Sequence, residues 1–226
     1  MKQMKIINIV LLTFILNISF ANAEITYKIF QNETASSYFD TIKTLRLKIR
    51  KEYPYLYIGT NIENEDTSYY SRSNETILVV AFEDDKAVGL VIGLPLKDFK
   101  FKKDHLLVSR KLRQNLGEDI LKYYYISELL VEENYRNQSV PETLIKTIEE
   151  KAKELKNYSI ISFMTVERED SHPLNSVTYF SENDLLRSLS YLPTGLLLPF
   201  AWPTLQPNGK VKKDKNYMQL WTKNLS

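Results

Sequence analysis

The chain has no cysteine, only two histidines and only six glycines among its 226 residues. The lack of cysteine excludes disulfides, thiolate nucleophiles and zinc–thiolate sites. The histidines, His105 and His172, are too few for a multi-histidine centre, so we expect no bound metal. The glycine-dependent patterns GxGxxG, GxxxxGK(S/T) and GxSxG do not occur either. A dinucleotide-binding domain, a P-loop and an α/β-hydrolase therefore lack support.

Residues 1–23 have the organisation of a secretory signal peptide. Lys2 and Lys5 precede an apolar run at residues 6–20, and the Ala-Asn-Ala triplet at residues 21–23 provides a cleavage site. The apolar run is short for a bilayer-spanning helix, which leaves an uncleaved anchor as the alternative. We expect cleavage, export to the periplasm or the outside of the cell, and no stable membrane insertion.

The mature chain, residues 24–226, is long enough for one domain with a sizeable core. Cleavage would remove two of the 30 lysines and arginines and none of the 28 acidic residues, leaving a nearly neutral protein. A nucleic-acid partner is therefore not expected, because it would require a basic surface.

Apolar patterning predicts an α+β domain. We expect strands at residues 25–31, 76–82, 87–94, 123–131 and 158–166, helices at 35–53, 66–72 and 144–155, and a partly helical excursion at 105–116. A polar tetrapeptide at 83–86 marks a hairpin, and Gly89 and Gly93 suggest a bulge or a close backbone approach. The last two strands flank a helix and should lie parallel and adjacent.

The stretch 123–155 organises the chain as strand, polar turn and helix. Such a unit presents the unpaired amides and positive dipole end of a helix to an anion. Arg136 lies in the turn, where a phosphate would arrive. The alternative is an ordinary strand–turn–helix with a solvated arginine. Ser139 and Glu142 have the spacing of a capping box.

The residues of this turn carry a resemblance to a known family. Glu128-Leu129-Leu130-Val131, followed by Tyr135-Arg136-Asn137-Gln138-Ser139-Val140-Pro141, resembles the acetyl-CoA-binding segment of the GCN5-related N-acetyltransferases (GNAT superfamily). The resemblance implies that backbone amides from Arg136 through Asn137, Gln138, Ser139 and Val140 cradle the pyrophosphate. It also implies that Leu129, Leu130 and Val131 lie along the pantetheine arm. Ser139 and Pro141 replace the two small residues of the family pattern, and proline has no N–H to donate.

The C-terminal third resembles one bacterial GNAT subgroup. The matching residues are HPLN at 172–175, YFSENDLL at 179–186, Ser190-Tyr191, Trp202 and MQLWTKNL at 218–225. Leu186 stands where many members have a helix tyrosine, and Ser190 stands where they have glycine. The resemblance implies a GNAT fold: a mixed, mostly antiparallel sheet of six to seven strands flanked by helices, with a parallel, splayed fourth and fifth strand.

Acyl transfer requires a base, aligned reactants and stabilisation of the leaving thiolate. Glu128 is the first candidate for the base, with a structural ion pair as the alternative. Tyr179 and Tyr191 are candidates for protonating the thiolate, or else core residues. His172 either orders its loop or serves as a base, and Asn175 either bonds the pantetheine or substrate or belongs to a turn. Arg136 is the candidate for a CoA phosphate contact.

These observations predict an acyl-CoA-dependent N-acyltransferase, with acetyl-CoA as co-substrate and direct attack by an amine in a ternary complex. The acceptor, a small molecule or a protein, is not identified. Acetyl-CoA is cytosolic, so export favours an alternative: a binding module that keeps the fold with a degraded CoA site. An exported effector that acetylates a host or competitor target is a third possibility.

Overall fold

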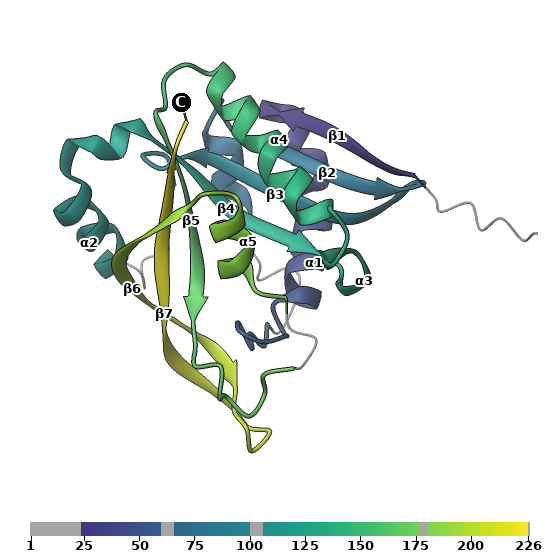
Figure 1. Cartoon of the computed structure of the whole chain (residues 1–226), viewed down its shortest axis with the longest axis vertical. Helices are drawn as coiled ribbons and strands as arrows, with labels where there is room; N and C mark the ends of the chain where they lie inside the picture. Colours follow the sequence, from purple (N-terminus) through teal and green to yellow (C-terminus); the bar gives the residue numbers. More distant parts are fainter. Residues whose placement is uncertain (1–23, 60–65, 100–105, 177–179, 226) are drawn as a thin grey trace, which may run out of the picture.

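The computed structural model describes residues 24–59, 66–99, 106–176 and 180–225. It contains a seven-stranded sheet in the order β1-β2-β3-β4-β5-β7-β6 (Figure 1). The strands are β1 (Ile25–Gln31), β2 (Ile77–Glu83), β3 (Lys86–Pro95), β4 (Tyr123–Val131), β5 (Ile160–Glu167), β6 (Leu192–Leu205) and β7 (Val211–Asn224). All neighbouring pairs are antiparallel except β4 and β5, which are parallel. The predicted fold class is confirmed.

Helices cover both faces of the sheet. They are η1 (Asn32–Tyr38), α1 (Phe39–Ile49), η3 (Ser68–Arg72), α2 (Leu106–Leu116), η5 (Gly117–Lys122), α3 (Glu133–Arg136), α4 (Val140–Glu154) and α5 (Glu182–Ser188). One core cluster joins the sheet to α1, and the other joins it to α4 and α5. Figure 1 shows α4 and α5 on the near face, with α1 behind the sheet. None of the described helices is both long and apolar enough to cross a bilayer.

The single helix predicted at residues 35–53 is wrong at both ends. The chain first forms the 3-10 helix η1, and α1 ends at Ile49. The serine-rich start favours local hydrogen bonds over an α-helical ladder, since Ser37 Oγ donates to the Thr34 carbonyl at 2.8 Å. The segment after α1 then turns back toward the sheet, where Tyr53 and Tyr55 are buried.

A bulge in β4 sets the position of the site. Ile92 of β3 pairs with Glu128 and Gly93 pairs with Ile126, so Ser127 is an extra residue in β4. A Cβ on Gly93 would lie 2.8 Å from a Tyr124 ring carbon, which explains the glycine predicted to permit a close approach. The bulge is where β4 leaves its parallel neighbour, because β4 and β5 pair only from Tyr123 to Ile126. Beyond it the two strands diverge (Figure 1).

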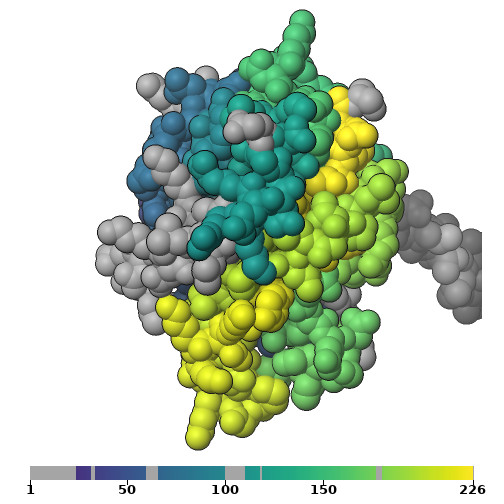
Figure 2. Space-filling view, turned by 90° about the vertical axis from the view of Figure 1, so that its left-hand side faces the viewer, coloured from purple at the N-terminus to yellow at the C-terminus, as the bar shows by residue number. Residues whose placement is uncertain are grey.

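The longest strands, β6 and β7, form a twisted hairpin beside β5. Its turn after Leu205 extends beyond the rest of the molecule, at the lower edge of Figure 2. Near its turn, the hairpin contacts the segment after α1, where Trp202 Nε1 donates to the Tyr55 carbonyl at 3.0 Å. The hairpin therefore helps to fix the loop that forms one wall of the opening between β4 and β5.

Candidate active site

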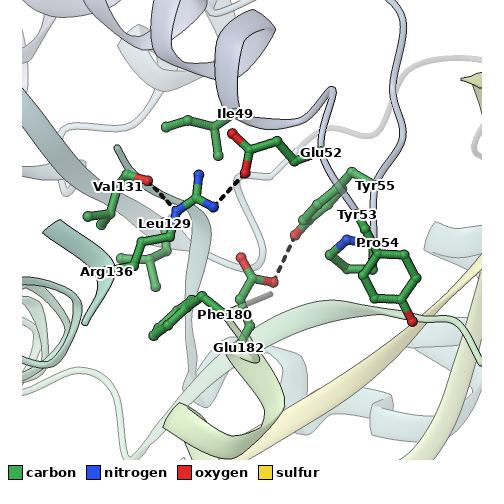
Figure 3. Close-up of a pocket in the computed structure, with 10 residues that line it drawn as sticks. All are labelled: Ile49, Glu52, Tyr53, Pro54, Tyr55, Leu129, Val131, Arg136, Phe180 and Glu182. Atoms are coloured by element: carbon green, nitrogen blue, oxygen red, sulfur yellow. Dashed lines mark hydrogen bonds and ion pairs between the residues drawn. The ribbon is translucent and has the colours of Figure 1, made fainter. Parts of the chain in front are cut away.

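A hollow of about 40 Å³, or about 410 Å³ when its open mouth is counted, lies where β4 and β5 diverge. Three parts of the chain form it: the end of β4 with α3, the end of α1 with its following loop, and the start of α5 (Figure 3). The lining residues are Ile49, Glu52, Tyr53, Pro54, Tyr55, Leu129, Val131, Arg136, Phe180 and Glu182. Apolar and aromatic walls with a few convergent charged groups are typical of a ligand site.

Arg136 forms the wall of this hollow next to β4. Its Nε donates to the Val131 carbonyl at 2.8 Å, and its Nη1 lies 2.5 Å from Glu52 Oε2 (Figure 3). Its Nη2 is buried and has no hydrogen-bond partner in the described structure. A second hollow of about 780 Å³, again counting its mouth, shares Glu52, Tyr53 and Arg136 with the first. The Glu52–Arg136 ion pair therefore stands between two hollows.

The turn before α4 satisfies much of its own hydrogen bonding. The amides of Asn137 and Gln138 both donate to the Tyr135 carbonyl, and the Val140 amide donates to the Gln138 carbonyl at 2.6 Å. Three amides that the family resemblance assigns to a pyrophosphate thus already have partners. Of the residues predicted there, Asn137, Gln138 and Ser139 are exposed.

The predicted capping box is wrong. The Ser139 side chain makes no capping hydrogen bond, and the Glu142 carboxylate instead binds Lys146 at 2.5 Å. The Ser139 carbonyl accepts from the Thr143 amide at 2.9 Å and the Thr143 hydroxyl at 2.7 Å. Pro141 in the first turn supplies the helix start without a donor. The glutamate therefore does not return to the turn, and its negative charge is paired along α4.

Glu128 lies on the α1 face of the bulge, with both carboxylate oxygens engaged. Oε1 lies 2.9 Å from Arg46 Nη2, and Oε2 accepts from Arg50 Nη2. The side chains of Glu128 and Arg46 are 4% and 7% exposed. Arg50 also lies over the Tyr55 ring, at 4.7 Å from its centroid. The arrangement is a buried cluster of two guanidinium groups around one carboxylate, which does not present a free oxygen to a substrate.

Glu182 is a second carboxylate that lines the hollow, besides Glu52. It is the first residue of α5, and the Tyr55 hydroxyl donates to its Oε2 at 3.2 Å. Burial raises the pKa of Glu182 to about 7, against the lowering influence of Arg50, the Tyr55 hydrogen bond and Arg136. Burial, followed by the Glu182 charge, also raises the pKa of Tyr55 well above its usual range. The pair holds a carboxyl group that changes protonation near neutral pH.

The loop after β5 carries two of the predicted residues. The ring of His172 lies 5.9 Å from that of Tyr53, and its Nδ1 accepts from the Leu174 amide at 3.2 Å. Burial and the nearby Arg168 lower the pKa of His172. Asn175 donates from Nδ2 to the Asp170 carbonyl at 2.9 Å, while its Oδ1 is buried without a hydrogen-bond partner in the described structure. Leu174 between them lines the second hollow.

The structure separates the other predicted residues. Leu129 and Val131 line the hollow, whereas Leu130 belongs to the core on the α1 face. Tyr191 is 1% exposed in the core beneath α4 and does not line either hollow. Burial and the neighbouring Glu149 raise its pKa well above the usual range. Tyr179 lies outside the described residues, as does the predicted signal peptide.

The sequence-based predictions do not include three residues that provide the polar groups of the hollow beside Arg136, namely Glu52, Tyr55 and Glu182. Glu52 and Tyr55 lie in the loop after α1 and Glu182 begins α5, where local patterning gives no sign of what a side chain faces. The only signal for Glu182 is Ser181, whose Oγ accepts from the Asp184 amide at 3.1 Å and so caps α5. A capped helix start fixes the position of its first side chain, and this could have drawn attention to Glu182.

The family model for the acetyltransferase (GNAT) family matches residues 42–174. The match runs from α1 through the loop after β5, which includes Glu52, Tyr55 and Arg136 but not Glu182, and the chain belongs to this family. It ends at residue 174, so the resemblance of the C-terminal third to one bacterial subgroup stays a prediction. No curated protein sequence gives a significant match.

Solved structures share the fold at low identity. One is a ribosomal-protein-alanine N-acetyltransferase from Brucella melitensis, with 13% identity, a TM-score of 0.55, and coverage of 87% of this chain and 99% of that one. Another is YncA, a putative acetyltransferase from Salmonella typhimurium solved with acetyl-CoA, with 9% identity, a TM-score of 0.55, and coverage of 88% and 94%. The Arabidopsis thaliana NAA60 structure, in complex with a bisubstrate analogue, has 13% identity, a TM-score of 0.54, and coverage of 89% and 98%.

Proposed function

We propose that this protein transfers the acetyl group of acetyl-CoA to an amine by direct attack in a ternary complex. The observation that carries the proposal is the hollow at the divergence of β4 and β5, in a chain of the GNAT acetyltransferase family. Leu129 and Val131 offer this hollow an apolar strand edge suited to the pantetheine arm. Holding thioester and amine side by side removes much of the entropic barrier to their reaction.

We assign the phosphates of acetyl-CoA to the side of the hollow formed by Arg136. Its guanidinium has one buried nitrogen with no hydrogen-bond partner among the described residues, and a guanidinium is well suited to bidentate phosphate binding. Binding would compete with Glu52 for the same group. Asn175 Oδ1 is also buried and has no hydrogen-bond partner in the part of the chain that the structure describes, and it supports the proposed hydrogen bond to the pantetheine or the acceptor.

Replacement of Arg136 tests this assignment. Arg136→Ala should weaken CoA binding by about 1.5–3 kcal/mol, the range for a hydrogen bond to a charged group. Isothermal titration of CoA into the protein measures the change, and Arg113→Ala, at an exposed arginine of α2, is the matched control. Equal affinity of the Arg136 and Arg113 variants would remove Arg136 from the site.

The acceptor is proposed as a small-molecule or peptide amine. The mature protein is offered acetyl-CoA with spermidine, a peptide with an N-terminal alanine and a lysine-containing peptide. We expect release of the CoA thiol together with a mass increase of one acetyl group on at least one acceptor. Thiol release without an acetylated product would show hydrolysis and would contradict the proposal.

We also propose that the protein is exported, because residues 1–23 have the organisation of a signal peptide. If they form a cleaved signal peptide, the exported protein begins at Glu24 and meets acetyl-CoA only where that compound is delivered, as in a host cell. Intact mass measurement of the protein from cell fractions tests this. A chain that retains residues 1–23 in a membrane fraction would favour an anchor.

A binding module without catalysis is the second candidate. It is favoured by the turn before α4, where the amides of Asn137, Gln138 and Val140 have partners and Pro141 has no N–H. Such a protein would keep the fold and would not be stabilised by acetyl-CoA. Restoring the donor through Pro141→Gly should tighten CoA binding if this turn limits affinity. An unchanged affinity would show that the turn is already competent.

A further inference from the structure

We propose that Glu182 is the group that accepts a proton from the acceptor ammonium, and that Tyr55 orients its carboxylate for this role. The inference rests on the proposed acetyl transfer and names the residue that prepares the amine for attack. Neither residue belongs to the strand that carries Glu128, and they come from the loop after α1 and the start of α5.

The geometry of the hollow favours Glu182 over Glu128. Both oxygens of Glu128 are bound by arginines, so a substrate amine would have to displace a buried guanidinium to reach them. Glu182 accepts one hydrogen bond, from Tyr55 to Oε2, and its Oε1 has no partner among the described residues. In Figure 3 its carboxylate lies between the Tyr55 hydroxyl and the Arg136 guanidinium.

The electrostatic surroundings suit proton exchange near neutral pH. Burial raises the pKa of Glu182 to about 7, where half of the groups are ionised and ready to accept a proton. The charged and titratable groups that act on it are Arg50 and Tyr55 after α1, Arg136 of α3 and Glu128 of β4. Of these, only Glu128 acts to raise the pKa further, while the other three favour the ionised form.

With this assignment, both protons that leave the acceptor nitrogen are accounted for. The acceptor ammonium gives one proton to Oε1 of Glu182, and the resulting amine forms a bond to the thioester carbonyl carbon. The carbon–sulfur bond then breaks, and the second nitrogen proton ends on the CoA sulfur. The products are the amide and the CoA thiol. Glu182 returns its proton to solvent, so each turnover releases one proton.

The pH dependence of kcat/KM tests the assignment, with acetyl-CoA and whichever of the three amine probes the wild-type protein acetylates. Wild-type activity should fall tenfold per pH unit below about pH 7, following the pKa of Glu182. Glu182→Gln should lose about 10²–10⁴-fold in rate together with this acidic limb. Tyr55→Phe should move the limb to higher pH, because it removes the hydrogen bond that favours the carboxylate.

A matched control and a binding measurement make the result specific. Asp184→Asn removes an exposed carboxylate from the same helix and should leave both rate and pH profile unchanged. The Glu182 variant should still bind acetyl-CoA, which shows that the hollow is intact. If the wild-type protein acetylates an amine and Glu182→Gln keeps its rate and acidic limb, the Glu182 assignment alone is overturned. If the wild-type protein binds acetyl-CoA and acetylates none of the probes, both proposals fall.

Discussion

Replacing Glu128 with glutamine should destabilise the protein strongly, whatever it does to turnover. Glu128→Gln removes the negative charge that the guanidinium groups of Arg46 and Arg50 share on the α1 face of β4. The side chain of Arg46 is 7% exposed and cannot turn to solvent without opening the contact of α1 with the sheet. Breaking a buried ion pair on one side costs about 3–5 kcal/mol. For a domain of this size, that loss corresponds to a fall in Tm of about 6–20 °C.

Urea unfolding followed by tryptophan fluorescence measures this loss, because Trp221 is 1% exposed in the core. The control is Glu132→Gln, one residue beyond β4, where the carboxylate pairs with Lys48 and Lys86 side chains that are 58% and 63% exposed. Ion pairs to such exposed partners contribute less than about 1 kcal/mol. If Glu128→Gln costs no more than Glu132→Gln, the buried charge cluster does not hold α1 against β4 as we describe.

Three further results are expected. Ser190, shortly after α5, has a φ of +66°, so Ser190→Gly should raise the free energy of unfolding by about 1 kcal/mol. Ser188→Gly within α5 should lower it by a similar amount. Equal effects of the two changes in urea unfolding would refute this. Glu52→Gln frees Arg136 from its ion pair and should tighten CoA binding by up to about fivefold in isothermal titration, as expected for a partly exposed pair. Weaker binding would mean that Glu52 helps to hold the ligand. The pKa of Glu182 is raised from 4.5 to about 7 in the folded state, so between these pH values the folded protein binds more protons than the unfolded chain, and the free energy of unfolding should fall as pH rises. Unfolding of wild type and Glu182→Gln at several pH values checks this. Identical pH dependence of the two proteins would contradict it.

The fold could be predicted from the sequence because patterns among neighbouring residues indicate most of its strands and helices. The strand at Tyr123–Val131 is apolar and aromatic except at Ser127 and Glu128, and the crossover through α4 leaves one arrangement for β4 and β5. Gly93 likewise marked the close approach beside the bulge. The conformation of Ser190 also fits, since a residue with positive φ occupies the position where the family resemblance expects glycine.

The site was less accessible because its contacts join residues far apart in the chain. Glu128 and Arg50 are 78 positions apart, Arg136 and Glu52 are 84 apart, and Tyr55 and Glu182 are 127 apart. Periodicity and motif spacing describe neighbours along the chain, so they could nominate Glu128 and Arg136 but not their partners. The partners change the chemistry: the arginines occupy Glu128, and the burial that raises the pKa of Glu182 depends on three separate segments.

Acetyl-CoA binding to the mature protein is the measurement that bears most directly on the proposed function. Residues 24–226 are heated with and without acetyl-CoA at concentrations up to about 1 mM, and Tm is recorded. A ligand at a hundred times its Kd stabilises the folded state by about 2.7 kcal/mol, which raises the Tm of a domain of this size by about 5–11 °C. We expect a rise that grows with acetyl-CoA concentration and that shrinks in Arg136→Ala. A Tm that stays constant up to millimolar acetyl-CoA would contradict the account and would leave the protein as a binding module built on the acetyltransferase fold.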